Sequence, residues 1–101
     1  MDKYQLSLLA KNDLIDIFQT SIDRWGANKA EQYANEIEAM LVKLSSSPNI
    51  GKCRDELFPG ALSFPVGSHV VFYQKGEQIN NIKVARILHQ NMDFYRHFNA
   101  F

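Results

Sequence analysis

The sequence lacks the features that stabilise or anchor many small proteins. Cys53 is its only cysteine, so no intramolecular disulfide can form, and without a histidine cluster it does not indicate a metal site. No hydrophobic run is long enough to span a membrane, and Asp2 and Lys3 stand where a secretory signal would have basic and then apolar residues. We therefore expect a cytoplasmic chain without metal or cofactor, stabilised by its hydrophobic core, by a partner, or by both.

A net charge is also missing. The 11 basic and 11 acidic residues give a formal net charge of zero, which argues against a protein that holds nucleic acid by bulk electrostatics. Residues 1–49 contain five basic and seven acidic side chains, whereas residues 50–101 contain six basic and four acidic ones together with all three histidines. This tilt is small and, taken alone, is typical of solvated charges placed by chance.

The composition that remains is that of one ordinary folded domain. Hydrophobic residues make up 46% of the chain and charged residues 22%, and no low-complexity tract or internal repeat interrupts the sequence. A chain of 101 residues is long enough to bury one hydrophobic core but not comfortably two. We therefore interpret residues 1–101 as a single domain with a single function.

The first half of the sequence predicts a strand followed by two helices. Apolar and polar residues alternate over residues 4–9, which indicates a half-buried strand. The apolar spacing then changes to three and four, which predicts a helix over residues 11–25. Trp25 and Tyr33 lie on the apolar stripes of the two helices, so we expect both in the core.

The link between these helices is short. Gly26 suits the C-cap of the first helix, and Asn28 with Glu31 forms a capping-box pattern that begins the second. Three serines and Pro48 end the second helix after residue 44. Two amphipathic helices joined so closely pack as an antiparallel hairpin.

The rest of the chain predicts β structure. Pro65 cannot donate to a β-ladder, so its strand is an edge strand or a bulged one. The tail over residues 91–98 forms one helical turn or lies extended. The predicted strands cover residues 61–66, 69–74 and 78–88, with Gly67-Ser68 as a hairpin turn. The predicted fold is thus an α+β domain with an N-terminal strand, an antiparallel helical hairpin and a three-stranded antiparallel sheet portion.

Short motifs along the whole chain have a recognisable order and spacing. They are Ile50–Leu57, Pro59-Gly60, Ser63–Tyr73 and Ile87–Asp93, preceded by Tyr4–Ser7, Ala10, Asp13-Leu14, Ile17, Trp25-Gly26, Ala30 and Tyr33. Together they resemble ParE-type toxins of the RelE/ParE toxin–antitoxin superfamily. The resemblance implies a type II toxin that inhibits DNA gyrase by binding, is neutralised by a ParD-like antitoxin, and does not itself bind nucleic acid sequence-specifically.

The RelE branch of this superfamily implies an alternative. Its members cut messenger RNA in the ribosome, and such chemistry needs an acid, a base and cationic stabilisation in one place. The polar candidates do not form a recognisable catalytic set, so we assign no catalytic residue. They are Lys52, Arg54, His69, Tyr73, Lys83, Arg86, His89, Arg96 and His97. A ribonuclease would have to use a non-standard set such as Arg86, His89 and Arg96, and a third alternative is a member that binds its antitoxin but has lost toxicity.

Three basic or imidazole residues are the candidates for target binding: Arg86, Arg96 and His89. An arginine in a central strand needs a counter-charge or an anionic ligand, which singles out Arg86. We expect His89 to bond the Asp93 carboxylate and fix the tail, and His69 to be satisfied by a backbone carbonyl.

Apolar residues are the candidates for antitoxin binding. ParE-like chains carry basic residues around Pro59-Gly60, whereas this chain is apolar there, which favours protein contact over phosphate contact. The expected antitoxin surface consists of Phe58, Leu62, Phe64 and Val66. Arg54 is expected to pair with a neighbouring acidic residue. The tail aromatics Phe94, Tyr95, Phe98 and Phe101 must be buried on the domain or on a partner.

Overall fold

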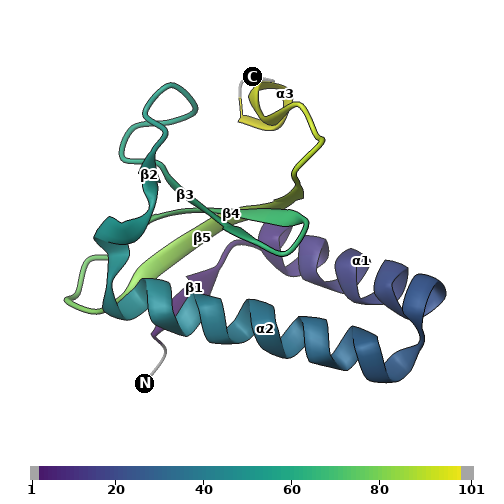
Figure 1. Cartoon of the computed structure of the whole chain (residues 1–101). Helices are drawn as coiled ribbons and strands as arrows, with labels where there is room; N and C mark the ends of the chain where they lie inside the picture. Colours follow the sequence, from purple (N-terminus) through teal and green to yellow (C-terminus); the bar gives the residue numbers. More distant parts are fainter. Residues whose placement is uncertain (1–2, 99–101) are drawn as a thin grey trace.

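The computed structural model describes residues 3–98. In chain order the elements are β1 (Tyr4–Leu6), α1 (Leu8–Trp25), α2 (Ala27–Ser46), the short 3-10 helix η1 (Pro48–Ile50), β2 (Lys52–Cys53), β3 (Leu62–Val66), β4 (His69–Lys75), β5 (Ile82–His89) and α3 (Phe94–Phe98). Figure 1 shows α1 and α2 as a hairpin along one face of the sheet, with α3 beyond the other face. The predicted α+β class and helical hairpin are confirmed.

The sheet is larger than the sequence predicts. Within residues 3–98, five strands pair in the order β1-β5-β4-β3-β2. β1 runs parallel to β5 and the other neighbours are antiparallel. Phe72 pairs with Arg86 whereas Tyr73 pairs with Val84, which leaves Ala85 as a bulge in β5. The predicted three-stranded portion is therefore the centre of a mixed sheet that β1 and β2 extend.

The main core lies between the sheet and the helical hairpin. Val71 and Tyr73 of β4 face the helices and are fully buried, because alternate residues of a strand share one face. The helices, β3 and β5 complete this cluster with Ala10, Ile17, Ile37, Leu41, Leu44, Val66, Ile82, Val84 and Ile87. Burial of these side chains holds α1 and α2 against the sheet.

A second, smaller cluster covers the opposite face of the sheet. Phe72 is fully buried there, and the rings of Phe94 and Phe98 lie with centroids 4.7 and 5.2 Å from its own. The tail thus forms a helix that seats two aromatic side chains on the domain, as one of the two predicted conformations requires. Tyr95 remains 52% exposed, and Phe101 lies outside the described residues.

The helix starts differ from the prediction. The first strand ends at Leu6, not at residue 9, because the Ser7 hydroxyl accepts the Ala10 N–H at 2.9 Å and caps α1 three residues earlier than predicted. The prediction that Asn28 caps α2 is wrong. The chain turns at Gly26, with φ of 88°, and α2 begins at once without a side-chain cap.

The strand boundaries differ too. β2 pairs only with Leu62 and Ser63 of β3, so Pro65 lies on an edge that β2 does not reach, as its missing N–H predicts. β5 begins at Ile82, not at residue 78. The preceding residues belong to a turn closed by the Gly76 N–H, which donates to the Asn81 carbonyl at 2.8 Å.

The apolar stripe of α1 is wider than the core that it covers. Leu8, Ile15, Phe18 and Trp25 are 74%, 65%, 40% and 49% exposed. The expectation that Trp25 fills the core is therefore wrong, since its ring only meets the edge of half-buried Tyr33 at 6.3 Å. None of the helices within residues 3–98 is both long and apolar enough to cross a membrane.

Candidate functional site

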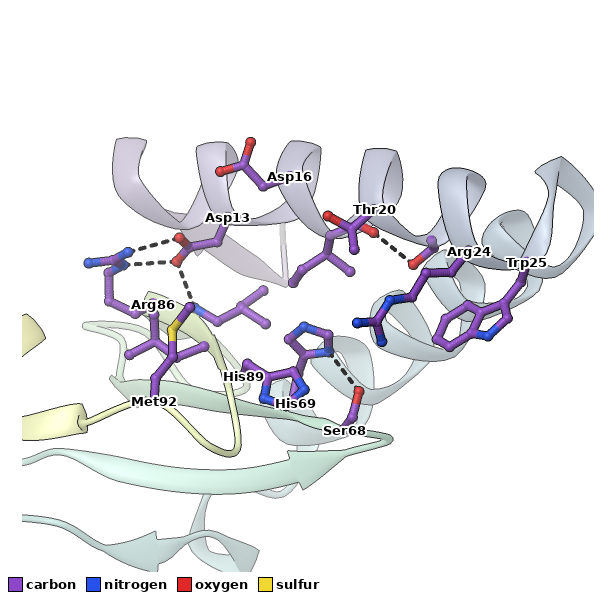
Figure 2. Close-up of a pocket in the computed structure, with 14 residues that line it drawn as sticks. Asp13, Asp16, Thr20, Arg24, Trp25, Ser68, His69, Arg86, His89 and Met92 are labelled. Carbon is purple, nitrogen blue, oxygen red and sulfur yellow. Dashed lines mark hydrogen bonds and ion pairs between the residues drawn. The ribbon is translucent and has the colours of Figure 1, made fainter.

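A cavity of about 430 Å³ lies where α1 passes the end of the sheet. Its walls come from α1, from the turn between β3 and β4, and from the last residues of β5 (Figure 2). The polar side chains that line it include Asp13, Asp16, Arg24, Ser68, His69 and His89. Two of the three predicted target-binding residues, Arg86 and His89, line this cavity.

Arg86 is held by a carboxylate from α1. Its Nε and Nη2 donate to Asp13 Oδ2 and Oδ1 at 2.8 and 2.9 Å, and both side chains are largely buried. Asp13 Oδ2 also accepts the Ile87 N–H at 2.9 Å. The hydrogen bond with Asp13 raises the pKa of Arg86 above its ordinary value. The predicted counter-charge is confirmed, and this arginine is a structural clamp between α1 and β5.

His69 is held by a phenol. Its Nδ1 lies 2.7 Å from the Tyr33 hydroxyl of α2, so the expectation of a backbone carbonyl partner is wrong. The same hydroxyl donates to the Val66 carbonyl at 3.1 Å and accepts the Ser68 N–H at 3.2 Å. Burial of the ring, followed by the proximity of His89, lowers the pKa of His69. Tyr33 therefore ties the β3–β4 turn to the helical hairpin.

His89 pairs with its strand neighbour and with its own turn. The two imidazole rings, from paired residues of β4 and β5, meet edge to face with centroids 5.4 Å apart. His89 Nδ1 accepts the Asn91 N–H at 3.2 Å, so the expectation that Asp93 fixes this ring is wrong. A backbone donor two residues away reaches the ring within the turn that follows β5.

Arg54 fixes α3 from the other side of the sheet. Its Nε donates to Glu56 Oε2 at 2.8 Å, which confirms the expected local pairing, and this bond lowers the pKa of Glu56. The guanidinium carbon also lies 5.8 and 5.6 Å from the ring centroids of Phe72 and Phe94. The sequence pattern indicates the ion pair but not this cation–π contact with the tail.

The third predicted target-binding residue lies apart from the cavity. Arg96 is exposed on α3, whereas the next residue, His97, places Nδ1 3.4 Å from Arg86 Nη1. The tail therefore approaches the same end of β5 as Arg86. Arg96 stands at the surface of that region rather than inside it.

The predicted antitoxin-binding residues do not share one surface. Leu62, Phe64 and Val66 pack on the core between sheet and helices. Phe58 belongs to the cluster on the opposite face, where its ring lies 5.3 Å from that of Phe98. The apolar segment that the sequence presents as continuous is divided by the sheet.

Sequence reasoning missed Asp13, Tyr33 and Arg24 as residues of this region. A signal existed for Asp13, because it lies three residues after buried Ala10 and four before buried Ile17 and so falls beside the core face of α1. Within residues 3–98 no group of three or more histidine, cysteine or acidic side chains could hold a metal ion.

Comparison with known proteins decides the family. A family model described as the ParE toxin of the type II toxin–antitoxin system parDE matches residues 4–94. The chain belongs to the ParE toxin family. It is 40% identical to Toxin ParE1 of Mycobacterium tuberculosis over 95 residues, which cover 93% of this chain and 95% of that one. It is 38% identical to Toxin ParE1 of Caulobacter vibrioides over 97 residues, covering 96% and 98%.

A solved structure shares the ParE fold. It is titled as the chromosomal ParDE TA system from P. aeruginosa, and its matching chain is 19% identical with a TM-score of 0.71. The match covers 85% of this chain and 92% of the other. At this identity the likeness concerns the fold alone.

Proposed function

We propose that this ParE-family toxin acts in the cytoplasm by binding DNA gyrase and blocking its cycle, without cleaving nucleic acid. Membership of the ParE family supports the target. The observation that most favours binding over ribonuclease chemistry is the pairing of Arg86 with Asp13. A phosphorane needs cations that are free to meet developing charge, whereas the Arg86 guanidinium already has a bidentate carboxylate partner.

The target-binding surface that we propose comprises Arg86, Arg96 and His89 at the end of β5 and on α3. Residues 50–101, which include this surface, contain more basic than acidic side chains. Gyrase with its bound DNA presents negative charge, so docking here is electrostatically favourable. Arg96 supplies the exposed charge. Arg86 acts from within, because its bond to Asp13 and its approach to His97 shape the surface.

A ParD-like antitoxin is the proposed neutralising partner. The exposed apolar residues of α1 need a cover, and the part of β3 beyond β2 offers unpaired backbone groups to an extended segment. Phe58, Leu62, Phe64 and Val66 remain the proposed side-chain contacts. Leu62 and Phe64 are half-buried, so the antitoxin would complete their burial from the sheet edge.

Induction of the chain in cells, with and without the antitoxin, tests this proposal. We expect growth arrest, loss of negative plasmid supercoiling and intact messenger RNA, all reversed by the antitoxin. Messenger cut in translating ribosomes, with supercoiling unchanged, would instead support the RelE-like alternative. Arrest without either change would point to another target.

A further inference from the structure

The cavity beside α1 presents two imidazole rings whose Nδ1 atoms are already engaged. His69 Nδ1 lies against the Tyr33 hydroxyl at 2.7 Å, and His89 Nδ1 accepts the Asn91 N–H at 3.2 Å. A neutral His89 that accepts at Nδ1 carries its hydrogen on Nε2. The ring nitrogen that each histidine has left for a ligand is therefore Nε2, and that of His89 is a donor.

Tyr33 is arranged to accept a hydrogen from a charged His69. Its hydroxyl hydrogen has an acceptor in the Val66 carbonyl at 3.1 Å, so its oxygen can accept from Nδ1 of a protonated ring. Protonated His69 would then be satisfied at Nδ1 and would donate from Nε2. In the absence of a ligand, burial and the neighbouring His89 hold the pKa of His69 below its ordinary value. A bound negative charge opposes both effects.

Arg24 adds a permanent positive charge to the same cavity. It is exposed on the last turn of α1, and Figure 2 shows its guanidinium directed toward the imidazole rings. The acidic lining residues do not cancel it. Asp13 is neutralised by Arg86, and the Asp16 carboxylate points away from the rings (Figure 2).

A backbone N–H of β5 is a further hydrogen-bond donor near the cavity. The Ile87 N–H leaves the sheet toward α1 and meets Asp13. Residues two apart in a strand direct their amides to the same side, so the His89 N–H points the same way, at the cavity. Ser68, whose hydroxyl lies 3.5 Å from His69 Nδ1, closes this end.

We propose that this cavity binds an oxyanion, a carboxylate or phosphate group, between Arg24, His69 and His89, and that His69 takes up one proton on binding. Its volume of about 430 Å³ is that of a site for a small ligand or a protruding side chain. The half-exposed Trp25 and Met92 provide apolar walls for the body that carries the anion. The site shares His89 with the proposed target-binding surface, but the proposal does not rest on gyrase inhibition and its test needs only the isolated chain.

NMR titration of the isolated chain tests the proposal. Sodium phosphate and sodium acetate are added separately at constant ionic strength, with sodium chloride as the reference salt, at about pH 5.5 and about pH 7.5. We expect saturable shifts of the His69 and His89 imidazole signals, a raised pKa of His69, and tighter binding of acetate, which stays largely ionised at both pH values, at the lower pH. The tighter of the two anions identifies the source of the oxyanion.

Matched variants separate a built site from general surface charge. Arg24→Gln should weaken binding about tenfold, whereas Lys11→Gln, which removes an exposed cation from the same helix outside the cavity, should leave it unchanged. His69→Gln should abolish the pH dependence of acetate binding. Absence of saturable imidazole shifts with both anions would overturn the proposal. So would equal weakening by Arg24→Gln and Lys11→Gln, and that comparison holds even if His69→Gln fails to fold.

Discussion

Arg86 and Asp13, 73 residues apart in sequence, form a bidentate ion pair that joins β5 to α1. The same carboxylate accepts the backbone N–H of Ile87. It therefore provides hydrogen-bond acceptors both for the Arg86 guanidinium and for a β5 amide beyond the stretch that pairs with β1. A central-strand arginine is thereby kept without an uncompensated charge. The end of the sheet that we propose as the target-binding surface depends on this pair for its shape.

Replacement of Asp13 by asparagine should therefore be costly. Asp13→Asn removes the negative charge and leaves Arg86 largely buried without a counter-charge, so we expect the free energy of unfolding to fall by about 2–4 kcal/mol. Asp16→Asn, on the exposed side of the same helix, should change it by less than about 0.5 kcal/mol. Urea denaturation measures both, and equal values would show that the pair contributes nothing specific.

Stability should fall in mild acid because of His69. Its pKa is lowered in the folded protein from the ordinary 6.5, so the unfolded chain binds the proton more readily. The stabilisation is complete above pH 6.5 and is lost as the pH falls through the interval down to the lowered pKa. In a buffer without phosphate or carboxylate, the melting temperature of the parent should drop across this interval. His69→Asn should reduce the slope, and an unchanged slope would exclude His69 as its source.

The tight turn before β4 should not tolerate a side chain at Gly67. Its φ of 57° favours glycine, and an added Cβ would overlap the Tyr33 ring and displace the hydroxyl from His69. Gly60 is the matched control, because its φ is 80° but the space around it is open. We expect Gly60→Ala to cost about 1 kcal/mol from backbone strain alone and Gly67→Ala clearly more. Thermal unfolding ranks the two variants, and the reverse order would contradict the structure.

Arg96 should contribute to target binding without supporting the fold. It is exposed on α3, so Arg96→Glu should leave the melting temperature and antitoxin affinity unchanged while weakening gyrase inhibition about threefold to tenfold. Lys43→Glu, an equal charge reversal at an exposed position of α2, should have no effect on inhibition. If Arg96→Glu inhibits as well as the parent does, docking uses another surface, and the helical hairpin becomes the next candidate.

The parts of the fold that follow a local period were predictable from the sequence. In the helices and the central strands, the apolar spacing repeats over several helical turns or several strand alternations. β2 has only two residues and forms by pairing with β3. So short a strand has no alternating pattern from which it could be predicted. Trp25 was predicted in the core because the apolar spacing shows which face of a helix is buried. It does not show how wide a part of that face the rest of the domain covers.

The partners within the site were less predictable. The position of Arg86 in a central strand predicted a negatively charged partner. Nothing in the sequence identifies Asp13, rather than another distant acidic residue, as that partner. Tyr33 and His69 meet only because α2 packs across the β3–β4 turn. For His69 the expected backbone carbonyl was replaced by a phenol from another element, whereas for His89 the local turn supplied the Asn91 N–H in place of Asp93.

A supercoiling assay with purified components measures directly whether this toxin inhibits gyrase by binding. The chain is added to DNA gyrase, ATP and relaxed plasmid, with excess ParD-like antitoxin in a parallel reaction and Lys43→Glu and Arg96→Glu as comparison variants. We expect dose-dependent loss of supercoiling, its restoration by the antitoxin, and weaker inhibition by Arg96→Glu alone. Full supercoiling at toxin concentrations well above that of gyrase, by a chain that is folded and binds its antitoxin, would contradict it.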